Sequence, residues 1–196
     1  MRRVVVSIGL ALVAIPAAAQ INENNGLALV KALRESQGSM AYSIVQANGP
    51  AVVNYRGPDG EAPLHVVTRL RNSNWVGYLL SNKADPNITD KDGDTPLIIA
   101  ARMGYTEGAQ RLLSARADLD RTNRRGETPL IVAVNQRQPG VVRLLLMAGA
   151  DPDKRDFAQG YSAREYAKRD SRMPELLRLI ETIKRPNRQV AGPVRR

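Results

Sequence analysis

The chain has 196 residues and a formal net charge of +10, with 43% hydrophobic and 24% charged residues. This balance is typical of a folded domain or a short repeat array, and it excludes an intrinsically disordered chain. The sequence contains no cysteine, which excludes disulfides, thiolate metal sites and cysteine nucleophiles.

The first 19 residues are typical of a bacterial export signal. Arg2 and Arg3 form a basic start, residues 4–15 are largely apolar, and residues 17–19 are three alanines. A membrane anchor is the alternative, but the apolar run of 12 residues is shorter than the ~20 needed to cross a bilayer. We therefore expect a signal peptide over 1–19, cleaved after Ala19, and a protein that is periplasmic or secreted.

Residues 26–54 follow as two expected helices and a short apolar segment. The helices are predicted at about 27–36 and 39–47, and the apolar segment is Ala51-Val52-Val53 with Asn54 after it. This region shares no clear motif with the segments that come next.

Two blocks of sequence then repeat without gaps at one constant spacing. The first block starts with Gly and carries Pro-Leu three residues later, at 60–65, 93–98 and 126–131. The second block combines Leu-Leu with Ala-Asp, at 79–85, 112–118 and 145–151. Two blocks held at one period indicate a repeat architecture.

The local chemistry of each period predicts two helices. Thr95 and Thr128 are suitable N-caps, and the prolines after them suit a first helical turn. Pro139 suits the start of a second helix, which Gly149 would end. Each unit is therefore predicted to be a helix-turn-helix followed by a turn-rich link.

This pattern resembles the ankyrin repeat, whose signature is T-P-L-H-x-A with a period of 33. The resemblance implies an all-α ankyrin-repeat solenoid, with helix-turn-helix units joined by hairpin-like links. The domain would span 20–183, with full repeats at about 57–89, 90–122 and 123–155. Residues 26–54 would form a divergent N-terminal cap.

The last unit is expected to be a C-terminal cap over 156–183. Its motif is Gly160-Tyr161-Ser162-Ala163, at a spacing of 34, and it carries Arg164 and Glu165 where the full repeats have apolar or His residues. A terminal repeat needs a polar outer face because no further repeat covers it. Residues 184–196 are basic and rich in proline, and are expected to be a disordered tail.

The residues offer little for catalysis or metal binding. The only histidine, His65, occupies the His position of the signature, where the resemblance implies a hydrogen bond to the backbone near the turn. Asp90, Asp92 and Asp94 open like a calcium loop, but Thr95 and Ala101 stand where such a loop needs Gly and Glu. Asp85, Asp118 and Asp151 recur with the repeat, which favours turn hydrogen bonds. We expect no enzyme, no metal and no cofactor.

The resemblance also implies which residues contact a partner, namely those of the links and of the concave face made by the first helices. In this sequence the predicted partner-binding residues are Arg56, Glu61, Arg69, Lys91, Asp92, Asp94, Arg102, Met103, Arg124, Arg125, Asn135, Gln136 and Tyr161. The predicted function is non-enzymatic binding of another protein outside the cytoplasm, by a monomer that does not bind nucleic acid. The alternative is attachment to anionic envelope polymers or lipid head groups through the basic tail and basic links.

Overall fold

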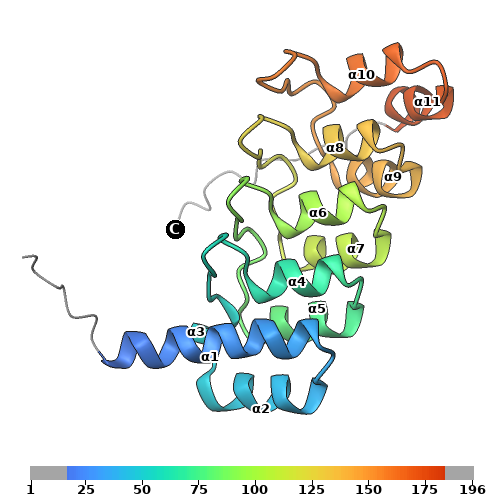
Figure 1. Ribbon diagram of the computed structural model, residues 1–196. Coiled ribbons are helices and arrows are strands. Elements are labelled where there is room, and N and C mark those ends of the chain that lie inside the picture. The colour runs from blue at the N-terminus through green and yellow to red at the C-terminus, as the bar shows by residue number, and fades with distance from the viewer. Residues whose placement is uncertain (1–16, 184–196) are drawn as a thin grey trace, which may run out of the picture.

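The computed structural model describes residues 17–183 and shows a solenoid of stacked helix pairs (Figure 1). The first helices of successive units are α4 (Pro63–Arg69), α6 (Pro96–Arg102), α8 (Pro129–Asn135) and α10 (Ala163–Arg169). The second helices are α5 (Ser73–Ser81), α7 (Thr106–Ser114), α9 (Pro139–Ala148) and α11 (Pro174–Thr182). The described residues hold no β-strand, only an isolated bridge between Arg155 and Ser162. The predicted all-α solenoid is therefore confirmed.

The first helices begin where the sequence predicts, because a hydroxyl caps each of the later three. Thr95 and Thr128 accept hydrogen bonds from the amides of Ile98 and Ile131, both at 3.2 Å. Ser162 does the same for α10, and Glu165 completes a capping box with it. These caps satisfy amides that the first turn of a helix leaves unpaired.

The core is a column of aliphatic side chains between the stacked units. α4 packs on α6, α6 on α8, and α8 on α10, while the second helices form a parallel row behind them (Figure 1). Leu64, Leu97 and Leu130 occupy the same position in successive first helices and are fully buried. Because each unit buries its apolar face only against its neighbours, the units stabilise one another.

The N-terminal region differs from its prediction at the start of the first helix. α1 (Ala17–Arg34) begins about ten residues earlier than expected, whereas α2 (Gly38–Asn48) and the short α3 (Pro50–Val53) lie close to the predicted segments. The alanines at 17–19 favour helix, and the Asn25 side chain is tied to Asn48 by a hydrogen bond of 2.7 Å. α1 packs on α2, α3 and α4, so it covers the first full repeat.

Both predicted terminal segments fall largely outside the described residues. The signal peptide over 1–19 lies there except for its last three residues, which start α1, and the basic tail over 184–196 lies there entirely. In the described part of the chain, no helix has the length and apolar character needed to span a membrane.

Three second helices end at a left-handed residue, and only one of these residues is glycine. Gly149 has φ +96°, whereas Lys83 and Arg116 occupy the same position of their repeats with φ +69° and +63°. A side chain in this conformation costs roughly 1 kcal/mol or more. The sequence already marks this departure, since Arg116 stands where the third repeat has Gly149.

We predict that Arg116→Gly raises the free energy of unfolding by about 1 kcal/mol, because it removes this strain without removing a buried contact. Urea unfolding followed by circular dichroism measures the change. Gln110→Gly, at an exposed position inside α7, is the control and should lower stability by a little under ~1 kcal/mol. A destabilised Arg116→Gly variant would contradict the account of this turn.

Candidate partner-binding surface

Each link ends in a tight turn, and these four turns are called fingertips here. Fingertips 1 to 4 are residues 57–61, 90–94, 123–127 and 156–161. In each one, the amide of the first residue donates to the carbonyl of the last, at 3.0, 3.1, 3.1 and 3.0 Å. Fingertip 4 is one residue longer than the others, which accounts for the spacing of 34 in the sequence.

A buried polar side chain holds the shape of fingertips 2, 3 and 4. Asp90, Asn123 and Asp156 recur once in each repeat, and each is only 5–6% exposed. In fingertips 2 and 3 the side-chain oxygen accepts from the amides two and four residues later, all at 3.0 Å. Asp156 accepts from the amides three and four residues later, at 2.8 and 2.9 Å. The backbone of these three turns is therefore held in one conformation, which fixes the positions of the outer residues.

The pKa of Asp156 shows how strongly fingertip 4 holds this carboxylate. Burial opposes its ionisation, but hydrogen bonds from Tyr166 and from backbone amides outweigh burial and lower the pKa. Burial of the Tyr166 hydroxyl and the same contact with Asp156 raise the pKa of that hydroxyl. The charged carboxylate is thus a structural part of the turn.

Adjacent fingertips are joined by their backbones into one continuous edge. The amide of Lys91 donates to the carbonyl of Asp59 at 2.9 Å, and that of Arg124 donates to Asp92 at 3.0 Å. The amide of Phe157 donates to Arg125 at 2.9 Å. These bonds fix the spacing between fingertips, so the edge can act as a preformed binding surface.

The first helices reach the fingertips through ion pairs. Arg69 contacts Glu61 at 2.5 Å and Asp90 at 3.0 Å. Arg102 contacts both oxygens of Asp94, at 2.5 and 3.1 Å. Four predicted partner-binding residues are therefore paired with one another or with Asp90, and they hold the fingertips against the helices.

Asp94 is the most strongly held of this set. Its side chain is buried, and the Asn123 side-chain amide donates to it at 3.0 Å. Burial opposes ionisation of Asp94, but the hydrogen bonds from Arg102 and Asn123 outweigh it and lower the pKa. Asp94 thus has a clear structural role and offers a partner little surface.

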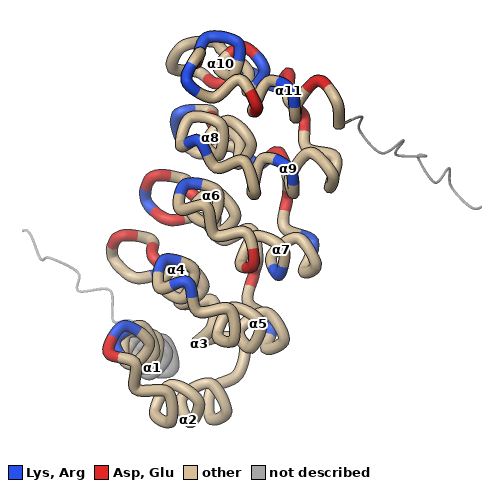
Figure 2. Tube along the Cα trace, turned by 90° about the vertical axis from the view of Figure 1, so that its right-hand side faces the viewer, with Lys and Arg blue, Asp and Glu red and all other residues tan. Residues whose placement is uncertain are grey.

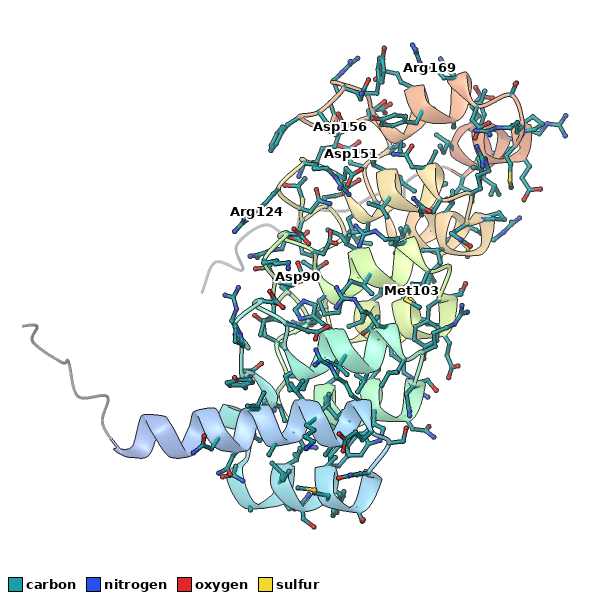
Figure 3. All side chains as sticks on the ribbon, in the orientation of Figure 1. Asp90, Met103, Arg124, Asp151, Asp156 and Arg169 are labelled. Carbon is teal, nitrogen blue, oxygen red and sulfur yellow. The ribbon has the colours of Figure 1, made fainter. Side chains whose placement is uncertain are left out.

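The remaining predicted partner-binding residues differ in whether their side chains already have a contact within the protein. Arg125 pairs with Glu127 at 2.7 Å, Lys91 pairs with Asp59 at 3.1 Å, and Arg56 donates to the carbonyl of Thr89 at 2.7 Å. The Arg169 guanidinium lies 4.5 Å from the centre of the Tyr161 ring. Met103 is partly buried against the core at the far end of α6 (Figure 3). Four of the predicted residues are exposed, and their side chains form no hydrogen bond or ion pair with the described residues. They are Asp92, Arg124, Asn135 and Gln136.

Several of the predicted residues meet in one place. A cleft of about 250 Å³ between fingertips 2 and 3 is lined by Asp92, Asp94, Arg102, Asn123, Arg124 and Arg125. Figure 3 shows Arg124 at the outer edge of the links. The cleft therefore has a rigid polar floor and a free cationic side chain at its rim.

His65 and the recurring aspartates take the structural roles expected of them. His65 Nδ1 accepts from the amide of Ala62 at 2.9 Å, so Nε2 carries the proton and donates to the carbonyls of Ile88 and Asp94, both at 3.1 Å. Burial of the imidazole lowers its pKa and outweighs the opposing effect of Asp90. The recurring residues Asp85, Asp118 and Asp151 each accept from the amide two residues later, at 2.8, 3.0 and 2.9 Å.

The loop that resembles a calcium site is an ordinary turn. One oxygen of Asp90 accepts two backbone amides, and the other faces Arg69 at 3.0 Å. Among the described residues, no group of three or more His, Asp or Glu side chains is arranged to hold a metal ion.

The comparison with known families agrees with this architecture. A family model described as ankyrin repeats (3 copies) matches residues 64–156. This part of the chain belongs to the ankyrin-repeat family. No curated protein matches the sequence. The matched range begins in α4 and ends in fingertip 4, so the ankyrin repeats contain fingertips 2 and 3 and the cleft between them.

Ankyrin repeats are generally protein–protein interaction modules, and the family is typically non-enzymatic. A second groove of this ankyrin-repeat protein, of about 580 Å³, lies between α5 and α7 on the side of the second helices. Its charged residues are Glu107 and Arg111, which pair with each other at 3.5 Å. The hydroxyls of its two serines, Ser81 and Ser114, donate to the backbone carbonyls of Tyr78 and Gln110 at 2.8 and 3.0 Å.

Sequence reasoning missed two features of the candidate surface. The turn role of Asn123 and Asp156 could have been found by stepping forward from Asp90 by one and two repeat periods. Phe157 in fingertip 4 was also missed, although it is 77% exposed. The sequence gives no sign of this exposure, because an aromatic residue is more often part of a core.

Proposed function

We propose that this ankyrin-repeat protein binds another protein through its fingertips and the face of its first helices, and that it catalyses no reaction. The observation that carries the proposal is the cleft between fingertips 2 and 3, with the unpaired Arg124 at its rim. A frame whose turns are already hydrogen-bonded loses little conformational entropy when a partner binds. Solenoids use such extended rigid edges for recognition.

The proposal that no reaction is catalysed is supported by the state of the titratable groups. Both ring nitrogens of His65 are occupied by backbone groups, and its side chain is fully buried. Beside the cleft, Asp90 is paired with Arg69 and Asp94 with Arg102, whereas Asp92 is exposed to solvent. A catalytic acid or base needs a reacting group within hydrogen-bond reach, which these contacts block.

The proposed place of action is outside the cytoplasm, in the periplasm or beyond it. The support is the basic, apolar and small-residue pattern of residues 1–19. Attachment to anionic envelope polymers would depend on the basic tail at 184–196, which lies outside the described residues, and on the basic links, which stand beside the acidic fingertip 2. The fingertip surface is therefore the better supported contact.

We predict that Arg124→Glu lowers the amount of partner protein captured from an extract (partner recovery) at least tenfold. The free energy of unfolding should change by less than ~0.5 kcal/mol. The reason is that the Arg124 side chain has no partner among the described residues but lines the cleft. The measurement is affinity capture from a periplasmic extract with quantitative mass spectrometry, beside a thermal melt of each variant. Reversing Arg125 as well should deepen the loss but also breaks its 2.7 Å pair with Glu127, so the single variant is cleaner.

Arg143→Glu provides the matched control, since Arg143 is exposed on α9 and the charge change is the same. Its partner recovery should equal that of the unmodified chain. Equal recovery by Arg124→Glu and the unmodified chain would reject the fingertip surface as the site of contact.

A further inference from the structure

Phe157 occupies the position in fingertip 4 that is cationic in fingertips 2 and 3. Lys91, Arg124 and Phe157 occupy the same position of successive fingertips, each one repeat period after the last. The amide of each one donates to a carbonyl of the preceding fingertip, at 2.9, 3.0 and 2.9 Å. The Phe157 side chain is therefore presented by the same rigid backbone edge that presents Arg124.

The ring of Phe157 is available to a partner. It is 77% exposed, more than any other large hydrophobic side chain among the described residues. One part of the ring lies against Gly126, where an added Cβ would be 2.6 Å from the ring Cγ. A phenylalanine has only two side-chain torsions to order on binding, and the backbone of Phe157 is already hydrogen-bonded, so it is suited to act as an interface anchor.

The charges around Phe157 have one predominant sign. Along the edge the exposed charges change from acidic at fingertips 1 and 2 to basic at fingertip 3 and beside fingertip 4 (Figure 2). Fingertips 1 and 2 expose Asp59 and Asp92, and the exposed Lys91 between them is paired with Asp59 at 3.1 Å. Fingertip 3 exposes Arg124 and Arg125, and Arg155 is exposed just before fingertip 4. Arg125 and Arg155 pair with glutamates at 2.7 and 2.6 Å, whereas Arg124 has no partner among the described residues.

We infer that fingertips 3 and 4 bind an acidic protein segment that places an apolar side chain on Phe157 and a carboxylate on Arg124. This inference rests on the proposed function and names the chemistry of its partner. A guanidinium with free donors favours a carboxylate, because charge-assisted hydrogen bonds are stronger than neutral ones. Arg124 and Phe157 stand on adjacent fingertips, so one short segment of a partner can reach both.

A long polyanion fits this edge less well than a short acidic segment. A nucleic acid or an acidic polymer that followed the edge past fingertip 3 would meet Asp92 and then Asp59. Like charges across an interface are unfavourable. Fingertips 3 and 4 alone offer the cationic and apolar groups together.

The test is a selection of random 12-residue displayed peptides on the full chain, followed by affinity measurement of the enriched peptides by fluorescence anisotropy. We expect enriched sequences that are acidic and carry at least one apolar residue. Their affinity should fall roughly tenfold for Phe157→Ala and for Arg124→Glu, as expected for interface anchors. Phe157→Leu should keep most of the affinity, and Arg143→Glu should keep all of it.

The inference is overturned if no peptide is enriched, or if the enriched peptides are neutral or basic. It is also overturned if a single-stranded oligonucleotide or a vesicle containing phosphatidylglycerol binds the Phe157 and Arg124 edge in preference to acidic peptides. Peptides that bind both variants as well as the unmodified chain would reject this inference alone and place the contact elsewhere. Absence of any captured protein in the extract experiment would instead reject the proposed function.

Discussion

Replacing Asn123 by alanine should lower the free energy of unfolding by about 3 kcal/mol, although it removes only a small polar group. The Asn123 oxygen accepts the amides of Arg125 and Glu127, both at 3.0 Å. Its amide group donates to Asp94 at 3.0 Å and to Glu127 at 2.8 Å. Alanine would leave two amides and two carboxylates without these partners in a mostly buried place, and each unsatisfied group costs ~1–3 kcal/mol when water cannot reach it.

Urea unfolding of the Asn123→Ala variant and of the unmodified chain measures this loss of stability. Asn135→Ala is the control, because Asn135 is an exposed asparagine at the end of α8. We expect its stability to stay within ~0.5 kcal/mol of the unmodified chain. If Asn123→Ala were as mild as the control, the buried side chains would not be what holds the fingertips.

Gly126→Val should destabilise the protein by about 3 kcal/mol and displace fingertip 4. Gly126 has φ +78°, a left-handed conformation that costs a side chain ~1–2 kcal/mol. A Cβ on this residue would lie 2.6 Å from the backbone nitrogen of Phe157, which cannot move without breaking its bond to Arg125. Relief of that overlap costs a further ~1–3 kcal/mol.

Urea unfolding gives the stability of this variant, and tryptic cleavage beside Arg155 reports whether fingertip 4 has been loosened. Gly38→Ala is a suitable control, since nothing lies within 4 Å of its Cβ position and its backbone is not left-handed. The control should be neutral or slightly more stable, because alanine is the better helix residue. A neutral Gly126→Val would contradict the close packing of fingertips 3 and 4.

The repeat and its helix caps could be predicted from the sequence because they depend on local chemistry. Thr95, Thr128 and Pro139 act within a few residues of their own positions, and the structure places each of them as expected. The early start of α1 was not predicted because the alanines at 17–19 also fit a signal-peptide cleavage site, and because the contact of Asn25 with Asn48 joins residues that no period relates. Tertiary contacts of this kind extend a helix beyond the range its own sequence favours.

The candidate site was predicted in outline but not in its internal pairing. The resemblance directs attention to the links, yet it does not say that Glu61 and Asp94 are held by Arg69 and Arg102. A signal for these pairs exists in the sequence, because acid and arginine stand eight residues apart in both repeats. The exposure of Phe157 depends on the fold, since an aromatic residue is more often part of a core.

Hydrogen exchange of the full chain, with and without a captured partner, tests the central claim most directly. The account predicts that a partner slows exchange of the amides in fingertips 2, 3 and 4 and in the ends of α6 and α8 nearest them. The groove between α5 and α7 should exchange at the same rate in both states. Slower exchange at that groove, with the fingertips unchanged, would contradict the claim that this ankyrin-repeat protein binds through its fingertips.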